Sequence, residues 1–244
     1  MIWIGTSGWA YDHWIGTFYP PDLSKQRWLR YYARHFSTVE INRSFYRLPS
    51  REQFASWATQ AAAEGEFLFA VKASRYITHL KKLNEVGDAL QRLAYVAEGL
   101  DSQLGPFLYQ LPPHWTVNPE RLASFIGELP AGQRAAFEFR DPSWYRPDVI
   151  SMLERSGSAL VIAVGGSLPT PLDLPPVGSF RYVRIHGGTQ GIGLTDDELE
   201  QLAHRLSSGP AADTDAYVYF NNDPEGYAVR NALRLRDMLG TLAR

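Results

Sequence analysis

The chain has 244 residues, a formal net charge of −2 and no cysteine. Without thiols it can form no disulfide, no thiolate metal site and no cysteine nucleophile. The small net charge excludes a protein that coats nucleic acid with a generally basic surface, although it does not exclude a local basic patch. Apolar residues make up 45% and charged residues 20%, which predicts a packed core.

The length suits a single α/β barrel, a fold of roughly 250 residues. No linker divides the sequence, so we expect one domain over residues 1–244. No apolar segment is long enough to span a bilayer, and no basic leader precedes an apolar run. These features predict a cytoplasmic protein without a membrane partner.

Eight β-rich segments recur along the chain, with helical patterns between most of them. In chain order they are "MIWIGTS", "STVEIN", "FLFAVKAS", "FLYQLPP", "AAFEFRD", "ALVIAV", "FRYVRIHG" and "AYVYFNND". Alternation of strands with helices implies parallel strands, and eight such units predict a TIM-type (β/α)8 barrel. The first and last strands should then be neighbours.

The segments between the strands support this fold. Apolar residues on one helical face are Trp28, Leu29, Tyr32, Ala33 and Phe36 after the first strand, and Leu199, Leu202, Ala203 and Leu206 after the seventh. Thr195 and Glu198 form a capping box for the latter helix. Between the sixth and seventh strands no good helical pattern appears, so we expect a degenerate sixth βα unit.

The strand interiors carry charged side chains. Val39 and Ile41 occupy one face of the second strand and Glu40 the other. An isolated buried carboxylate is costly to desolvate, so the fold must supply a partner. The same alternation points four more side chains into the barrel, namely Lys72, Glu138, Arg184 and His186. The set predicts either a structural ion-pair network, with Lys72 paired to Glu40, or a catalytic site.

Polar residues gather where the strands end. In this barrel class the carboxyl ends of the strands form the mouth where ligands bind. Besides Arg184, the candidates for substrate binding are Trp9, Asn42, Arg43, Ser74, Arg75, Gln110, Arg140, Gly187, Asn221 and Asn222. The arginines should attract anions. Trp9 and the other first-loop aromatics could stack on a sugar or base, or form core beneath a long loop.

Seven longer motifs occur in order along the chain. They are "IGTSGWAYDHWIGTFYP", "FSTVEINRSFYRLPS", "FAVKASRYITHLKKL", "LGPFLYQLPP", "AFEFRDPSW", "YVRIHG" and "VYFNND". Together they resemble the YecE-like family, known as domain of unknown function 72, and the resemblance implies a single TIM-barrel-like domain. The sequence departs from the family pattern at Val164, where we expect an aspartate, and in "GGTQGIGLTDDEL", which lacks a tyrosine after the histidine-glycine pair. A mechanism that needs an acid from the sixth strand is therefore not expected.

Several chemistries can be weighed on these residues. Glu40, Glu138 and His186 could ligate a divalent metal, but no ligand spacing supports this and the nearby cations compete for the carboxylates, so we predict neither metal nor cofactor. A retaining glycosidase would need the two glutamates about 5 Å apart across the barrel. Lys72 could form a Schiff base if it is desolvated near another cation.

The interpretation we prefer is an enzyme acting on a small anionic, phosphorylated or sugar-like substrate. Glu40, Lys72, Glu138 and His186 are its predicted catalytic residues, with His186 or Glu138 as general acid or base and the cations stabilising negative charge. The alternative is a protein that binds a nucleic-acid strand or end, and a variant of this alternative would cleave phosphodiesters with a metal. No protein partner can be named from the sequence.

The loops after the seventh and eighth strands frequently hold phosphate in such barrels. Here they read "HGG" and "NNDPEG", and the glycines would let backbone amides approach an oxyanion. We therefore expect an anion near Gly187 and Asn222. Asp223 argues against this site, because at the start of the next helix its carboxylate would occupy the same amides.

Overall fold

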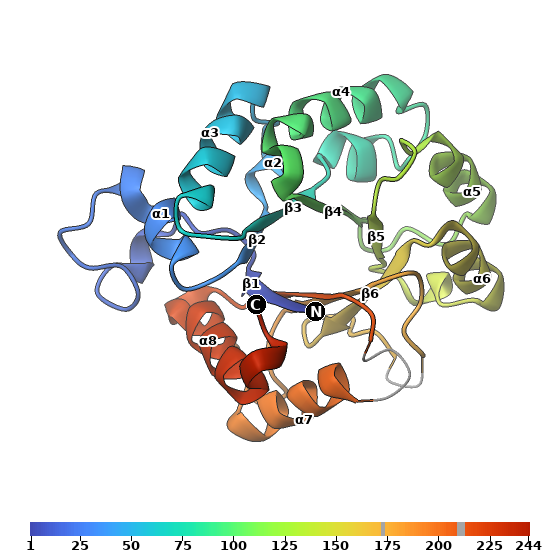
Figure 1. Ribbon diagram of the computed structural model, residues 1–244. Coiled ribbons are helices and arrows are strands. Elements are labelled where there is room, and N and C mark those ends of the chain that lie inside the picture. The colour runs from blue at the N-terminus through green and yellow to red at the C-terminus, as the bar shows by residue number, and fades with distance from the viewer. Residues whose placement is uncertain (172–173, 209–212) are drawn as a thin grey trace.

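The structure is a computed structural model, and it describes residues 1–171, 174–208 and 213–244. One eight-stranded sheet runs in the order β1-β8-β7-β6-β5-β4-β3-β2, with every neighbouring pair parallel (Figure 1). The strands are β1 (Ile2–Thr6), β2 (Thr38–Ile41), β3 (Leu68–Lys72), β4 (Leu104–Gln110), β5 (Ala135–Glu138), β6 (Ala159–Val164), β7 (Arg181–Ile185) and β8 (Ala216–Phe220). The predicted pairing of the first and last strands is confirmed.

Helices surround the sheet as an outer ring (Figure 1). They are α1 (Trp28–Ala33), the short α2 (Arg43–Tyr46), α3 (Arg51–Ala62), α4 (Gly87–Ala97), α5 (Pro119–Glu128), α6 (Pro147–Ser156), α7 (Asp196–Ser207) and α8 (Tyr227–Leu239). Thr195 and Glu198 form the predicted capping box of α7. In the described parts of the connection between β6 and β7, residues 165–171 and 174–180, there is no helix. The TIM-type barrel with a degenerate sixth unit is confirmed.

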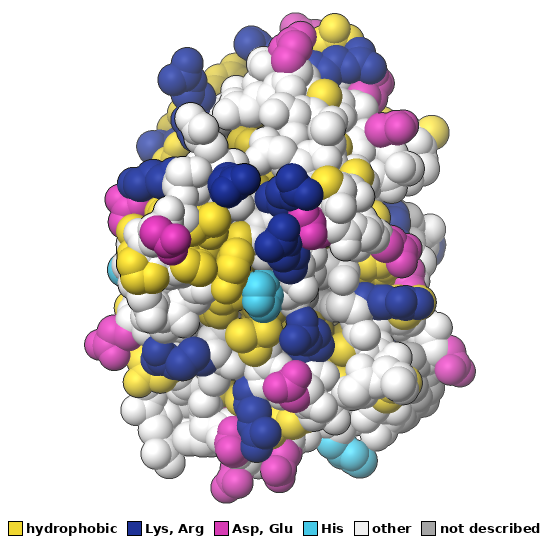
Figure 2. Space-filling view, turned by 60° about the vertical axis from the view of Figure 1, so that its left-hand side comes forward, with side chains coloured by type: hydrophobic (Ala, Val, Ile, Leu, Met, Phe, Trp, Pro, Cys, Tyr) yellow, Lys and Arg dark blue, Asp and Glu magenta, His cyan; other side chains and the backbone are white. Residues whose placement is uncertain are grey.

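Charged side chains of both signs cover the outside of the barrel. Figure 2 shows Lys and Arg side chains interspersed with Asp and Glu on the face that carries the left-hand side of Figure 1. Some pair across elements, as where Arg34 contacts Glu64 and Arg234 contacts Asp196. Exposed pairs of this kind contribute little stability each. Among the described residues, no helix combines the length and the hydrophobicity that crossing a bilayer requires.

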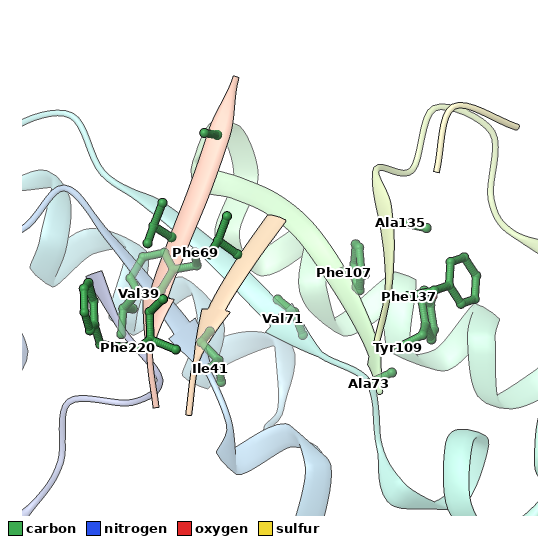
Figure 3. Close-up of a cluster of buried hydrophobic side chains, with 14 of the residues drawn as sticks. Val39, Ile41, Phe69, Val71, Ala73, Phe107, Tyr109, Ala135, Phe137 and Phe220 are labelled. Atoms are coloured by element: carbon green, nitrogen blue, oxygen red, sulfur yellow. The ribbon is translucent and has the colours of Figure 1, made fainter. Parts of the chain in front are cut away.

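The buried apolar residues form two separate clusters because side chains alternate along each strand. The larger cluster lies between strands and helices and includes Val39, Ile41, Val71, Tyr109 and Phe137 (Figure 3). The smaller one fills the barrel interior and includes Trp3, Ala70, Leu108, Ala136, Val161, Tyr182, Tyr217 and Tyr219. Toward the carboxyl ends of the strands, the interior positions become polar.

The seam between β1 and β2 is closed by a side chain from α1. The hydroxyl of buried Tyr32 accepts a hydrogen bond from Thr6 N at 2.9 Å and donates one to Thr38 O at 3.0 Å. The two strands come very close at Gly5, where an added Cβ would lie 2.1 Å from Thr38 O. Tyr32 therefore replaces part of a ladder that the strands do not complete themselves.

We predict that Tyr32→Phe lowers the free energy of unfolding by about 1–3 kcal/mol, because it leaves a buried N–H and a buried carbonyl without partners. Urea denaturation measures the change. Tyr31→Phe is the matched control, since the Tyr31 hydroxyl makes no hydrogen bond to the described residues. Equal stability of the two variants would contradict the role given to Tyr32.

Candidate functional site at the barrel mouth

Arg184, on β7, joins two carboxylates from opposite parts of the sheet. Its Nε and Nη2 lie 3.0 and 2.8 Å from the carboxylate oxygens of Glu40 on β2, and its Nη1 lies 2.6 Å from Oε2 of Glu138 on β5. All three side chains are almost fully buried. The sequence-based expectation that these side chains meet inside the barrel agrees with these contacts.

Glu40 accepts two further hydrogen bonds. Ser7 Oγ donates to its Oε1 at 2.5 Å, and the hydroxyl of Tyr182 donates to its Oε2 at 2.6 Å. Burial alone would raise the pKa of Glu40, but the charge and hydrogen bonds of Arg184 outweigh it and hold the pKa below its usual value. Glu40 is therefore a carboxylate whose acceptor sites are occupied by the protein.

The carboxylate of Glu138 contacts two arginine side chains and one histidine side chain. Besides Arg184, Arg140 Nη1 lies 3.0 Å and His186 Nε2 lies 2.9 Å from its Oε1. Burial opposes ionisation here too, but the charge of Arg184 and the hydrogen bond from His186 keep the pKa of Glu138 well below its usual value. Glu138 thus remains ionised and orients the imidazole.

His186 lies between Glu138 and an amide. Its Nδ1 is 3.3 Å from Asn221 Nδ2, while Nε2 faces Glu138. An amide N–H₂ can only donate, so in this contact Nδ1 is the acceptor and Nε2 is left to donate to Glu138. The contact with Asn221 is long, so it holds Nδ1 only weakly.

Lys72 does not make the ion pair with Glu40 that the sequence led us to expect. Within the described part of the chain, no carboxylate forms an ion pair with its ammonium group; the expected pair with Glu40 is absent because Arg184 and Ser7 occupy that carboxylate. Lys72 Nζ instead lies 4.4 Å from the centre of the Phe45 ring. Burial, and then the charge of Arg184, lower the pKa of Lys72 to about 8.

The environment of Lys72 is built by two short elements that follow β2 and β3. Ser44 of α2 donates a hydrogen bond to Lys72 O at 2.6 Å, which ties α2 to the end of β3. A π-helical turn, η3 (Tyr76–Leu80), places His79 edge-on against Phe45, with ring centres 5.0 Å apart. Turns of this type occur frequently at functional sites. Burial and the charge of Lys72 lower the pKa of His79.

The first loop and the end of β8 meet on another side of the mouth. Asp223 accepts hydrogen bonds from Trp14 Nε1 at 2.7 Å and pairs with His13 Nε2 at 2.9 Å. Its carboxylate therefore does not cap the helix after β8, contrary to expectation. The Tyr11 hydroxyl donates to Ser7 O at 2.6 Å. Burial, with Asp223 and Glu40 nearby, raises the pKa of Tyr11 to about 12.

Some of the amides that we expected to face an anion, in the loops after β7 and β8, are bonded within the protein. Gly188 N donates to Gly191 O, and Thr189 N donates to Glu198 Oε1 at 2.7 Å. Asn222 is buried and donates to Ile192 O and to Asn231 Oδ1. Internal acceptors therefore occupy several donors of this region, and the expected anion site near Gly187 and Asn222 stays a prediction.

The remaining candidates are exposed arginines and partly buried residues near the ends of the strands. Arg43 and Arg75 are exposed and make no ion pair with the described residues. Gln110 is partly buried at the end of β4, directly beside Glu138 in the parallel register. The Ser74 carbonyl accepts the first amide hydrogen bonds of η3. Asn42 directly follows β2, and its Oδ1 is buried without a partner among the described residues.

Trp9 is not brought into the charged cluster. Its ring packs edge-on against Trp57 of α3, with ring centres 5.1 Å apart. Two other aromatic residues of the first loop, Trp14 and Tyr19, are fully buried, and Tyr19 stacks on Trp28 at 4.7 Å. Most of the first-loop aromatics therefore form core beneath the loop, which is the second of the two alternatives.

Three residues of the site escaped the sequence-based selection. Tyr182 could have been found, because it shares the inward face of its strand with Arg184 and His186. Ser7 directly follows β1 and forms an isolated β-bridge with Glu40. Phe45 carried no signal, since it lies in a helix of only four residues, where alternation predicts nothing. Among the described residues, no three acidic or histidine side chains are grouped so that they could hold a metal ion.

The fold and the mouth define a TIM-type barrel with an internal charge network. The chain belongs to the family described as "Protein of unknown function DUF72", which it matches over residues 3–244. It is 26% identical over 278 residues to the UPF0759 protein YunF of Bacillus subtilis, covering 98% of this chain and 95% of that protein. To the UPF0759 protein YecE of Escherichia coli K12 it is 28% identical over 148 residues, 59% of this chain and 50% of YecE. The resemblance to the YecE-like family is thereby confirmed.

Solved structures agree with the fold. A DUF72 family protein from Thermotoga maritima is 27% identical and has a TM-score of 0.85, covering 98% of this chain and 99% of the other. D-psicose 3-epimerase has a TM-score of 0.54 at 10% identity, covering 96% of each chain, and at this identity the likeness shows a shared fold alone.

The buried carboxylates predict acid sensitivity. The folded-state pKa values of Glu40 and Glu138 lie below the ordinary value of 4.5, so their stabilising contribution is present above pH 4.5 and is lost as the pH falls below it. We predict that Glu138→Gln costs about 3–5 kcal/mol at pH 7 and flattens this acid dependence. Urea denaturation between pH 7 and pH 3 tests both effects. Exposed Glu66→Gln is the control, and a wild-type stability independent of pH below 4.5 would contradict the network.

Proposed function

We propose that this protein is an enzyme that binds a small anionic substrate at the carboxyl-end mouth of the barrel. The observation that carries the proposal is the ammonium group of Lys72, which pairs with no carboxylate of the described residues. Four charged side chains act on it, and the two carboxylates Glu40 and Glu138 balance the two arginines Arg184 and Arg140. Lys72 therefore adds an uncompensated positive charge in a partly desolvated site, and such a charge favours a bound anion.

The accessible groups suggest a division of roles. Arg140 is 20% exposed and His186 is 11% exposed, whereas Glu40 and Glu138 are almost completely buried. We assign proton transfer to His186, with Glu138 as the positioning residue that holds its tautomer, as in other carboxylate–histidine pairs. Arg140 and Lys72 would hold the anionic group and stabilise developing negative charge.

The arrangement disfavours the glycosidase alternative. A retaining glycosidase needs one protonated carboxylic acid and one nucleophilic carboxylate. The pKa values of Glu40 and Glu138 are both lowered despite burial, since Arg184 bridges the two carboxylates. Neither glutamate would supply a proton near neutral pH, and the acceptor sites of Glu40 are filled by Ser7, Tyr182 and Arg184.

A nucleic-acid strand remains the second candidate because of one feature of the rim. Tyr46 is 76% exposed and Tyr76 is 47% exposed. The exposed Arg43 is the first residue of α2, and the exposed Arg75 directly precedes η3. Aromatic rings beside cations can stack on bases and contact phosphates. This surface lies outside the network, so binding there would not depend on Lys72.

The two candidates predict different responses to Lys72→Met. For an enzyme with an anionic substrate, inorganic phosphate and sugar phosphates raise the melting temperature of the wild type, and the substitution weakens their binding about tenfold or more, because it removes a charge-assisted contact. Thermal shift titration measures this. Lys81→Met, a nearby lysine outside the network, should behave like the wild type.

The stability of Lys72→Met tests whether Lys72 lacks an ion pair with Glu40. Its folded-state pKa of about 8 lies below the ordinary 10.5, so the charged form is disfavoured in the fold, and stability should rise as the pH increases from about 8 to 10.5. At pH 7, Lys72→Met should therefore be as stable as the wild type or more stable. Salt-sensitive oligonucleotide binding that survives Lys72→Met, with no response to small anions, would contradict the enzyme proposal.

A further inference from the structure

We propose that Lys72 is a covalent catalyst whose Nζ condenses with the carbonyl carbon of an aldehyde or ketone substrate to form a Schiff base. This inference rests on the proposed function and names its substrate class, a carbonyl compound that carries an anionic group. It requires an amine that is accessible, partly desolvated and free of carboxylate partners.

The geometry around Lys72 meets these requirements. Lys72 is the last residue of β3, and strand ends at the mouth are where reacting groups of this barrel class lie. Its side chain is partly buried, and the Phe45 ring, 4.4 Å from Nζ, covers it with an apolar surface. The carboxylates that could have held an ammonium ion are both occupied by Arg184.

Burial is the main reason that the neutral amine is favoured at Lys72. The groups that face it from the neighbouring elements are Glu40 on β2, Glu138 and Arg140 on and after β5, Arg184 on β7 and His79 on η3. Burial acts most strongly, Arg184 adds to it, and the two carboxylates oppose it, with a resulting pKa of about 8. A desolvated lysine beside another cation is a recognised way to obtain an amine nucleophile near neutral pH.

The reaction balances without an external oxidant or reductant. The Nζ lone pair attacks the carbonyl carbon, a C–N bond forms, and the C=O π electrons move to the oxygen, which takes a proton. The proton that the oxygen takes comes from the attacking nitrogen, which gives a neutral carbinolamine. A second proton, from solution, then allows the hydroxyl group to leave as water. The product is a protonated imine that withdraws electrons from the adjacent carbon, where His186 could then remove a proton.

Reductive trapping provides the test, because the sequence contains only four lysines, Lys25, Lys72, Lys81 and Lys82. The intact chain is incubated with glyceraldehyde 3-phosphate and sodium cyanoborohydride, which reduces an imine to a stable secondary amine. Peptide mass spectrometry then gives the rate of modification at each lysine and at the amino terminus. Uncharged glyceraldehyde serves as the comparison reagent.

We expect Lys72 to react about tenfold faster than the other three lysines at pH 7, with a half-maximal rate near pH 8. Inorganic phosphate should slow this reaction, and Lys72→Met should abolish the fast adduct while Lys81→Met keeps it. Modification of Lys72 at the same rate as Lys25, Lys81 and Lys82 would overturn the inference.

The outcomes separate this inference from the function on which it rests. Stabilisation by phosphate without selective modification of Lys72 would overturn the Schiff base and leave the anion site standing. Equally fast trapping of both aldehydes at Lys72, without any stabilisation by phosphate, would retain the nucleophilic lysine and overturn the requirement for an anionic substrate.

Discussion

The contact on which the mouth depends is the guanidinium of Arg184 between Glu40 and Glu138. It ties β2, β5 and β7 together across the barrel interior, where the polypeptide offers no hydrogen-bonded ladder. Desolvating three charges is costly, so the arrangement is sustainable only because nearly every donor and acceptor is matched. Ser7, Tyr182 and His186 supply the additional contacts. The interior tyrosines thereby connect the charged layer to the apolar layer beneath it.

Because these carboxylates are already hydrogen-bonded to Arg184, the neighbouring Lys72 and His186 have fewer partners within the protein. Because Arg184 takes both carboxylates, no carboxylate of the residues described pairs with the ammonium group of Lys72. Among the same residues, Nδ1 of His186 has a long contact with the Asn221 amide alone. Burial divides these side chains into two groups. Glu40, Glu138 and Arg184 are almost completely buried, whereas Lys72, Arg140 and His186 are only partly buried.

The sequence predicted the barrel and the inward direction of its charges, because both follow from alternation along strands that are long enough to show it. It did not predict which charges pair. Lys72 and Arg184 are equivalent in a one-dimensional pattern, and only the length and forked geometry of arginine let it reach two carboxylates at once. Contacts made by the segments between strands could not be predicted from the sequence either. Phe45 over Lys72 and Trp14 on Asp223 depend on how a four-residue helix and a long first loop fold back.

At the end of the sixth strand this chain departs from the sequence pattern expected for the family. Where an aspartate was expected, Val164 contributes its backbone: its carbonyl accepts the amide of His186 at 2.8 Å, and its side chain packs at the edge of the outer core. Close by, Gly165 approaches so near that an added Cβ would lie 2.1 Å from Gly187 O. The end of β6 therefore fixes the backbone that carries His186 but brings no acid of its own. The carboxylate that contacts the His186 imidazole comes instead from Glu138 at the end of β5, the strand next to β6.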